Sequence, residues 1–169
     1  ALYCDPVESK KRKSTILLLN IILNSLLKWF APILSFTTEE IYRLLFKDSK
    51  SIHLEKFLDF PISFANKKLY QKWIELIKIR NICNISIEEK RANKEIGSSL
   101  EANLNINLDK KLEEITKNID FSELCITSKA EISFKENIET SAKTTKAKGT
   151  KCTLCWKINE NACDRVHCP

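Results

Sequence analysis

Residues 151–156, with the sequence KCTLCW, place Cys152 and Cys155 close together near the end of the chain. Two residues separate the two cysteines, and this C-x2-C spacing lets two thiolates hold one tetrahedral ion from a tight turn. Further cysteine and histidine residues follow, which is typical of a structural zinc site. The alternative is a group of reduced or disulfide-bonded cysteines that hold no metal. The pattern favours zinc, so we expect residues 151–169 to form a zinc-binding knuckle.

Two sets of zinc ligands are compatible with the sequence. The first set consists of cysteines within the chain: Cys152, Cys155, Cys163 and Cys168. His167 is a substitute for one member of this set, because imidazole and thiolate are both zinc ligands. The second set keeps Cys152, Cys155 and Cys168 and takes its fourth ligand from a residue beyond Pro169, in which case the knuckle is truncated here.

The composition is that of an ordinary soluble globular protein. The 169 residues are 43% hydrophobic and 30% charged, which allows one core with a small appended module. A net charge of +6 fits a nucleic-acid partner, although it also serves solubility. Seven cysteines without a targeting pattern indicate a reducing compartment. The chain contains no methionine, so we expect it to be either processed or, as the favoured alternative, a piece of a longer protein.

The first predicted helix starts at Asp5, which we expect to be its N-cap, and continues to Phe30. Pro32 should end or kink it. Its polar residues share one narrow stripe, so we expect the rest of its surface to be buried. The uncharged stretch over 14–27 is shorter than the roughly 20 apolar residues that a bilayer requires, and we therefore expect no membrane partner.

Two further helices complete the predicted bundle over residues 1–95. Thr37 and Glu40 have the spacing of a capping box and indicate the start of the second helix. Asn66 is the expected N-cap of a long third helix, which should continue to about Asn93 because its apolar residues recur at helical spacing. Three helices with short connections favour a helical bundle.

The hydrophobic pattern changes after residue 96. Leu104, Ile106 and Leu108 alternate with asparagines, as in a half-buried strand. A short helix and a second strand over 124–134 would complete a small α+β subdomain over 96–134. The stretch 135–150 has little apolar content and several lysines, so we expect a mobile basic linker there.

The sequence offers no catalytic machinery. Its only glycines are Gly97 and Gly149, so it has no glycine-rich phosphate loop. His53 has no evident catalytic partner. The paired acids, such as Glu39 and Glu40, are adjacent in sequence and point in different directions on a helix. We therefore expect no catalytic residue within this chain.

Binding of RNA is better supported. Basic side chains neutralise phosphates, and an exposed aromatic ring stacks on an unpaired base. Taken singly, each lysine is more commonly a solvated charge, and Trp156 could equally pack on the knuckle. The candidate RNA-binding residues are Lys10, Lys11, Arg12, Lys13, Arg80, Lys151, Trp156 and Lys157.

Residues 2–5 (LYCD) resemble the entry into the helical bundle of a known family, and four further stretches carry the same resemblance. Residues 30–42 (FAPILSFTTEEIY) are similar to "LAPILPFTAEEIW", and residues 51–54 (SIHL) to "SVHL". Residues 96–102 match "IGSSLEA", and residues 149–156 (GTKCTLCW) match "G-x-K-C-x-x-C-W". The chain resembles the C-terminal part of a bacterial-type isoleucyl-tRNA synthetase across nearly its whole length. The first of the four further stretches is shared with the valyl and leucyl enzymes, whereas the last two point to the isoleucyl enzyme.

The resemblance implies a class I synthetase that charges isoleucine tRNA with ATP and magnesium. Its implied fold is mainly α: an anticodon-binding helical bundle, a small α+β subdomain and a C-terminal zinc knuckle. This portion would bind the anticodon stem and loop, hold structural zinc, contact the rest of the synthetase chain and work as a monomer in the cytoplasm. The catalytic and editing domains have no counterpart in these residues. The family's second cysteine pair is usually C-x2-C, whereas Cys163 and Cys168 are separated by four residues.

Three other interpretations remain open at the level of sequence. One is the equivalent part of a valyl or leucyl enzyme, which the cysteine pair near the C-terminus disfavours. Another is a free-standing zinc-containing RNA-binding module. The third is a protein-interaction bundle whose positive charge serves only solubility.

Overall fold

The computed structural model describes residues 2, 5–47 and 50–160. These residues form two compact units, and the division falls between Ala65 and Asn66. The helical bundle expected over 1–95 is therefore divided, because its third helix packs with the residues that follow it. None of the helices in the described residues is both long enough and apolar enough to span a membrane.

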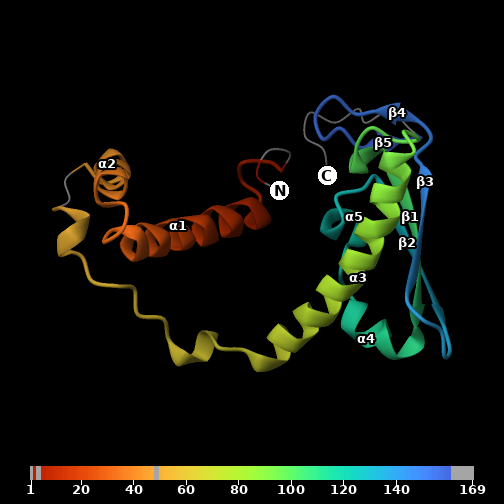
Figure 1. The fold of residues 1–169 in the computed structure, drawn as a ribbon, viewed down its shortest axis with the longest axis horizontal. Coiled ribbons are helices and arrows are strands. Elements are labelled where there is room, and N and C mark those ends of the chain that lie inside the picture. Colours follow the sequence, from red (N-terminus) through yellow and green to blue (C-terminus); the bar gives the residue numbers. More distant parts are fainter. Residues whose placement is uncertain (1, 3–4, 48–49, 161–169) are drawn as a thin grey trace. The chain divides into compact units, whose positions relative to one another are not determined.

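The first unit is helical (Figure 1). It contains α1 (Lys10–Phe30) and α2 (Ser35–Leu45), followed by the short 3-10 helices η1 (Ile52–Leu54) and η2 (Ile62–Phe64). Its small core joins α1, α2 and η1. The buried members of this core are Leu27, Ala31, Tyr42 and Ile52, with Leu23 packed against them.

The two helix starts predicted in this unit were placed wrongly. Helix α1 is capped by Ser9, whose hydroxyl accepts a hydrogen bond from the Arg12 backbone N–H over 3.4 Å. Asp5 is outside the helix. Helix α2 already begins at Ser35, so the predicted capping box lies inside it. The end of α1 at Phe30 agrees with the predicted effect of Pro32.

Helix α1 is much more exposed than its sequence indicates. Only Ser25 and Leu27 are buried, and Leu17 is 63% exposed. The physical reason is that, within its unit, α1 packs mainly against α2 and η1, which are both much shorter than α1. An apolar composition all round a helix shows that burial would be favourable, but it does not supply the neighbours that would bury it.

Glu39 connects α2 to η1. One oxygen of its carboxylate accepts hydrogen bonds from the Ser51 hydroxyl over 2.8 Å and from the Ile52 backbone N–H over 2.9 Å. The other oxygen accepts a hydrogen bond from Arg43 over 2.6 Å. The Arg43 bond, followed by the Ser51 bond, lowers the pKa of the Glu39 carboxyl. The ionised carboxylate thus holds the backbone of Ile52, whose side chain is part of the core.

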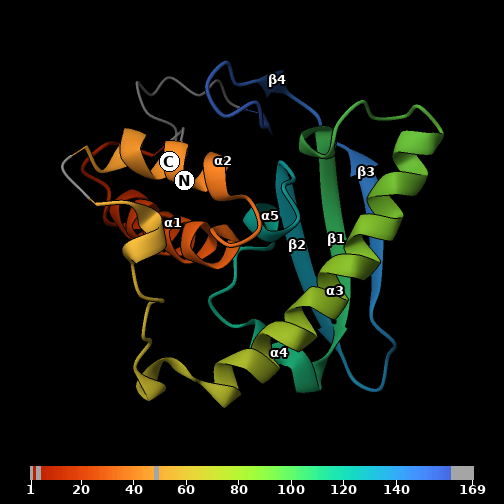
Figure 2. The same ribbon diagram turned by 60° about the vertical axis from the view of Figure 1, so that its left-hand side comes forward.

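The second unit is a helix packed on a three-stranded sheet (Figure 2). Helix α3 (Lys67–Ala92) is capped by Asn66 and ends close to the predicted position, which confirms both its start and its length. The sheet has the order β2-β1-β3, with β1 (Ala102–Asp109) parallel to β2 (Lys129–Lys135) and antiparallel to β3 (Ser141–Lys146).

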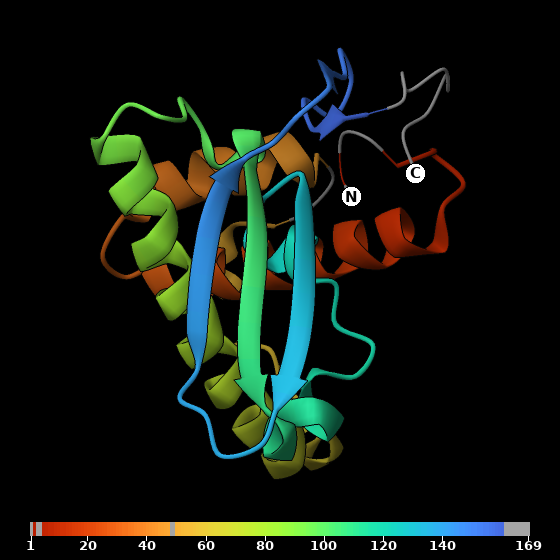
Figure 3. The same ribbon diagram turned by 90° about the vertical axis from the view of Figure 1, so that its right-hand side faces the viewer.

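Strand β3 corrects the prediction of a mobile linker over 135–150. It pairs with β1 along its whole length, and α3 packs against it (Figure 3). Its inward residues are the half-buried Ala142 and the fully buried Thr144, whose hydroxyl shares a hydrogen bond with that of Ser86 over 2.8 Å. The side chains are small or polar, so the strand has little of the apolar content that sequence analysis detects.

Short elements precede β1, connect β1 to β2 and follow β3. The 3-10 helix η3 (Ser99–Glu101) precedes β1, and η4 (Lys110–Leu112) with α4 (Glu113–Thr116) follows it. Helix α5 (Phe121–Leu124) leads into β2. The two-residue strands β4 (Thr150–Lys151) and β5 (Ile158–Asn159) form an antiparallel hairpin after the sheet.

The core of the second unit lies between α3 and the sheet. The predicted alternation in β1 is confirmed, because Leu104, Ile106 and Leu108 are buried while the asparagines between them are not. Cys83 and Cys125 belong to the same core. The hydrogen bond with Cys125 and burial raise the pKa of the Cys83 thiol, so Cys83 remains protonated at neutral pH and serves as a packing residue.

Candidate nucleic-acid interface and zinc knuckle

The β4–β5 hairpin holds the Cys152–Lys157 turn. The Cys152 backbone N–H donates a hydrogen bond to the Lys157 carbonyl over 2.9 Å, and the Trp156 N–H donates one to the Cys152 carbonyl over 3.0 Å. Gly149 lies at the base of the hairpin with φ +127°, and a Cβ atom there would lie 2.1 Å from the Asn159 carbonyl oxygen. The residue before the hairpin must therefore be glycine.

Within this turn, one backbone amide donates to a sulfur atom. The Leu154 backbone N–H donates a hydrogen bond to Cys152 Sγ over 3.4 Å. Hydrogen bonds to the charged form of a group stabilise that form, and the thiolate is the form that binds metal. Cys152 is 7% exposed, and Cys155 is half-buried in the same turn. The arrangement fits one half of a tetrahedral zinc site.

The second half of the predicted zinc site lies outside the described residues. Cys163 and Cys168, together with the substitute His167, belong to this part. Among residues 2, 5–47 and 50–160, no group of three or more histidine, cysteine or acidic side chains could hold a metal ion. The four-cysteine ligand set therefore stays a prediction.

Two serines attach the knuckle to the α+β body. The Ser128 hydroxyl accepts a hydrogen bond from the Ile158 backbone N–H over 2.6 Å and donates one to the Leu100 carbonyl over 2.5 Å. The Lys157 ammonium donates a hydrogen bond to the Ser122 hydroxyl over 3.1 Å. Because these bonds reach β5 and the turn before it, the hairpin is held against the end of the sheet.

Trp156 is presented to solvent rather than packed on the knuckle. Its side chain is 60% exposed, and its backbone adopts φ +63°, which is uncommon for a large side chain. The Lys151 ammonium lies 5.6 Å from the centre of the indole ring, within the range of a cation–π contact. An exposed aromatic face beside a cation is the arrangement that stacks on a base next to a phosphate.

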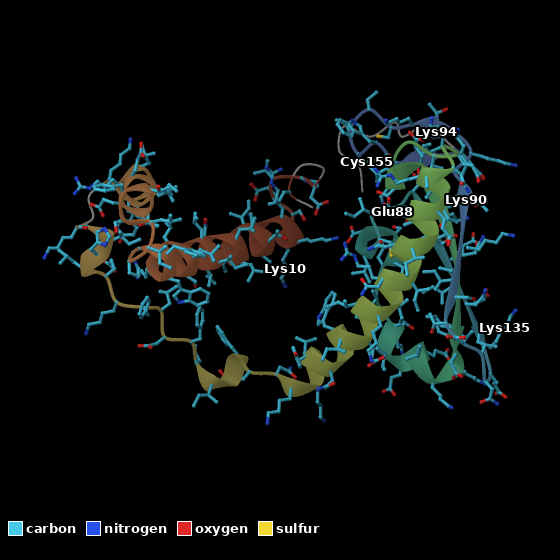
Figure 4. All side chains as sticks on the ribbon, in the orientation of Figure 1. Lys10, Glu88, Lys90, Lys94, Lys135 and Cys155 are labelled. Carbon is cyan, nitrogen blue, oxygen red and sulfur yellow. The ribbon has the colours of Figure 1, made fainter. Side chains whose placement is uncertain are left out.

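The basic residues at the start of α1 differ in their surroundings. Lys10 (Figure 4) and Lys11 are both exposed, and they lie in the first turn of the helix. Arg12 is half-buried, and its guanidinium donates a hydrogen bond to the Asp5 carbonyl over 3.0 Å. Lys13 forms an exposed ion pair with Glu8. Lys10 is therefore better placed than Arg12 and Lys13 to contact a phosphate.

Arg80 and Lys157 are engaged with the protein itself. Arg80 is half-buried on α3, and its Nε donates a hydrogen bond to the Leu124 carbonyl over 3.0 Å, which ties α3 to α5. Lys157 is similarly occupied by Ser122. A contact of either residue with RNA would have to share or replace these bonds.

Three exposed lysines near the knuckle are not among the RNA-binding residues chosen from the sequence, although Lys94 was noted there as a charge near the end of the long helix. Lys94 follows α3 with φ +58°, while Lys146 ends β3 and Lys148 comes two residues later. Lys146 and Lys148 were assigned to the linker. No regular alternation of residues marks this stretch, because the inward residues Ala142, Thr144 and Ala147 are not evenly spaced, so the sequence alone gives no clear signal for them.

Comparison with known proteins connects this geometry to a family. A family model described as "Anticodon-binding domain of tRNA ligase" matches residues 1–108, which include α1, α2, α3 and nearly all of β1. The chain belongs to this family. The part of the chain that matches this anticodon-binding domain contains the helical first unit and helix α3, which covers the sheet.

Individual relatives of this anticodon-binding domain match more than nine tenths of the chain. The isoleucine--tRNA ligase of Pelagibacter ubique is 64% identical over 98% of the chain, and that of Bartonella henselae is 34% identical over 95%. The isoleucine--tRNA ligase of Agrobacterium fabrum is 33% identical over 93%. In each case, the chain spans less than a fifth of the relative's length: 18%, 18% and 17%, respectively.

Proposed function

We propose that this chain is the part of an isoleucine–tRNA ligase that recognises the anticodon stem and loop of isoleucine tRNA. The observation that carries the proposal is the match to the anticodon-binding domain family, combined with three similar proteins that are each named isoleucine--tRNA ligase. Attachment of isoleucine to the tRNA with ATP and magnesium would take place in other domains of the same polypeptide, in the cytoplasm, with the ligase acting as a monomer.

The surface chemistry supports RNA as the partner. Lys10 and Lys11 are exposed on the first unit, and Lys151 with Trp156 is exposed on the second. Cations at these positions would neutralise phosphates, and the indole would stack on an unpaired base of the anticodon loop. An anticodon stem and loop offers both partners, because its stem is a duplex and its loop has unpaired bases.

Zinc is proposed as the structural cofactor of the knuckle. Cys152 and Cys155 would provide two thiolate ligands, and Cys163 and Cys168 are proposed as the other two. The N–H···S bond to Cys152 supports this assignment because it favours a thiolate. The metal would join the β4–β5 hairpin to the residues after 160, and it takes no part in a reaction.

Binding of the whole chain to isoleucine tRNA tests the proposed function. We expect tighter binding to isoleucine tRNA than to valine or leucine tRNA, with an affinity that falls steeply as salt rises. Equal binding to all RNAs would favour a general zinc-containing RNA-binding module. A preference for valine or leucine tRNA would assign the chain to those ligases, and no binding would leave a protein-interaction role.

A separate measurement tests the zinc proposal. We expect one zinc ion per chain by metal analysis, and loss of that ion in Cys152→Ser and in Cys163→Ser. Cys83→Ser is the matched control, because Cys83 is buried in the core between α3 and the sheet. Retention of zinc in Cys163→Ser, together with loss in Cys152→Ser, would move the ligand role from Cys163 to His167 or to a residue beyond 169.

A further inference from the structure

The fold brings three lysines from separate segments to one edge of the sheet. Because β1 and β2 are parallel, both begin at the same edge, and the antiparallel β3 ends there. This edge, called the knuckle edge, also receives the end of α3 and the β4–β5 hairpin. In Figure 4, Lys94 and Cys155 lie at this end of the unit, whereas Lys135 lies toward the opposite end of the sheet. The three lysines in question are Lys94, Lys146 and Lys148.

Three acidic residues around the knuckle edge already have partners within the protein, whereas Glu160, which follows β5, is exposed and has no ion pair within residues 66–160. Glu95 pairs with Lys90 over 2.9 Å, and Glu88 pairs with Arg91 over 2.7 Å. The carboxylate of Glu101 accepts a hydrogen bond from the Gly97 backbone N–H over 2.9 Å.

The three lysines themselves differ from these paired residues. All three are exposed, and among residues 66–160 no carboxylate lies within ion-pair distance of any of them. The knuckle edge therefore presents positive charge that the protein does not use in its own ion pairs.

The backbone that carries two of these lysines is held in place. Ala147 lies between Lys146 and Lys148 and is buried, and its N–H donates a hydrogen bond to the Glu101 carbonyl over 2.7 Å. Lys146 itself is paired in register with Ala102 at the start of β1. The two ammonium groups thus start from fixed backbone positions, which reduces the conformational entropy lost when a ligand binds them.

We propose that Lys94, Lys146 and Lys148 form a phosphate-binding surface for RNA that continues from Lys151 and Trp156. The proposal rests on the proposed function, because it assumes that the knuckle contacts tRNA. The indole would stack on a base, while the three lysines hold phosphates of the backbone on either side of it. RNA fits this surface better than an acidic protein does, because a stacking aromatic group and a row of cations are both present.

The charge of the surface can be tested with two matched sets of variants. The first replaces Lys94, Lys146 and Lys148 with glutamine. The second replaces Lys111, Lys117 and Lys135, which are exposed near the opposite edge of the same sheet and are likewise outside every ion pair within residues 66–160. Both sets remove three positive charges, so any effect of net charge is the same in the two proteins.

Salt dependence of tRNA binding is the decisive measurement. We expect the knuckle-edge triple variant to bind about tenfold or more weakly at ~0.1 M salt, with a slope of log affinity against log salt that is shallower by about 2 to 3. The opposite-edge variant should change the slope by less than about 1. Arginine at Lys94, Lys146 and Lys148 should preserve the slope. Equal slopes in the two glutamine variants would overturn the proposal.

The same experiment separates this proposal from the proposed function. Each protein is titrated with isoleucine tRNA and with valine tRNA. If the unmodified chain binds both equally but only the knuckle-edge variant loses slope, isoleucine specificity fails and the phosphate surface stands. If isoleucine tRNA is preferred but the two glutamine variants behave alike, the function stands and the surface fails. Unchanged thermal unfolding of both variants confirms that folding is intact.

Discussion

The backbone N–H of Ile158 donates a hydrogen bond to the Ser128 hydroxyl over 2.6 Å, which joins strand β5 of the knuckle to the residue preceding strand β2. Ser128→Ala removes this acceptor and leaves the Ile158 N–H without its partner. We expect a loss of about 1–2 kcal/mol in the stability of the hairpin. Hydrogen exchange of the β4 and β5 amides should accelerate, with no change in the core of α3. Ser133→Ala, at an exposed position on β2, is the matched control, and equal protection in both variants would show that Ser128 does not hold the knuckle.

Trp156 should contribute to RNA binding through its ring rather than through stability. Trp156→Ala is expected to weaken tRNA binding by about 1–3 kcal/mol, the usual effect of losing one base–aromatic stack. Trp156→Phe should retain part of this affinity because a smaller aromatic face remains. Trp29→Ala serves as a control, since Trp29 on α1 is exposed to a similar degree, 55% against 60%. A Trp156→Ala protein that binds tRNA normally would exclude stacking at this position.

Glu39 makes the first unit sensitive to acid. Its pKa is lowered, first by the Arg43 hydrogen bond and then by the Ser51 bond, so the folded state favours the ionised carboxylate. The resulting stability is fully present above the ordinary glutamate pKa of about 4.3, and it is lost as the pH falls through the lower pKa of the folded state. In Glu39→Gln, this part of the acid-induced loss should disappear from thermal unfolding curves recorded between pH 6 and pH 3. Glu40→Gln, an exposed neighbour on α2, should keep it, and identical curves for both variants would argue against a role for Glu39.

Gly149 should tolerate no side chain. In Gly149→Ala, the new methyl group would overlap the Asn159 carbonyl, and the φ of +127° is strained for alanine. We expect the hairpin to lose about 1–3 kcal/mol, the typical range for such backbone strain, with weaker zinc binding as the readout. Gly97→Ala is the control, because its methyl group would meet only the Glu101 carboxylate at 3.5 Å. If Gly149→Ala binds zinc as the unmodified chain does, the backbone at this turn has another acceptable conformation.

Those elements whose pattern is local were predicted well from the sequence. Asn66 caps α3, and the alternation of Leu104, Ile106 and Leu108 identifies β1, because both signals depend only on neighbouring residues. Strand β3 was missed because its inward positions, such as Ala142 and Thr144, are small or polar. These residues face inward because β3 pairs with β1 in the sheet, and no pattern among neighbouring residues indicates that pairing.

The functional surface was predictable only in part. The cysteine spacing identifies the Cys152–Lys157 turn, since its chemistry is contained in a few consecutive residues. Lys94 and Lys146 are more than fifty positions apart, and they share an edge only because β3 returns beside the start of β1. Conversely, Arg80 has a basic side chain, but its Nε donates a hydrogen bond to the Leu124 carbonyl. That bond depends on the tertiary packing of α3 against α5, which the sequence does not reveal.

The strand order β2-β1-β3 also has a consequence for the way the protein is synthesised. The central strand β1 is the first strand of the sheet to leave the ribosome. The side of β1 that pairs with β3 stays without a partner until β3 has been synthesised. Helix α3 also makes most of its contacts with the sheet through β3. Nascent chains that stop after residue 135 should therefore expose the apolar side of β1 and depend on chaperones. Chains long enough to release Lys146 should become resistant to protease in a single step. Arrested ribosome–nascent-chain complexes of these two lengths would reveal this late closure.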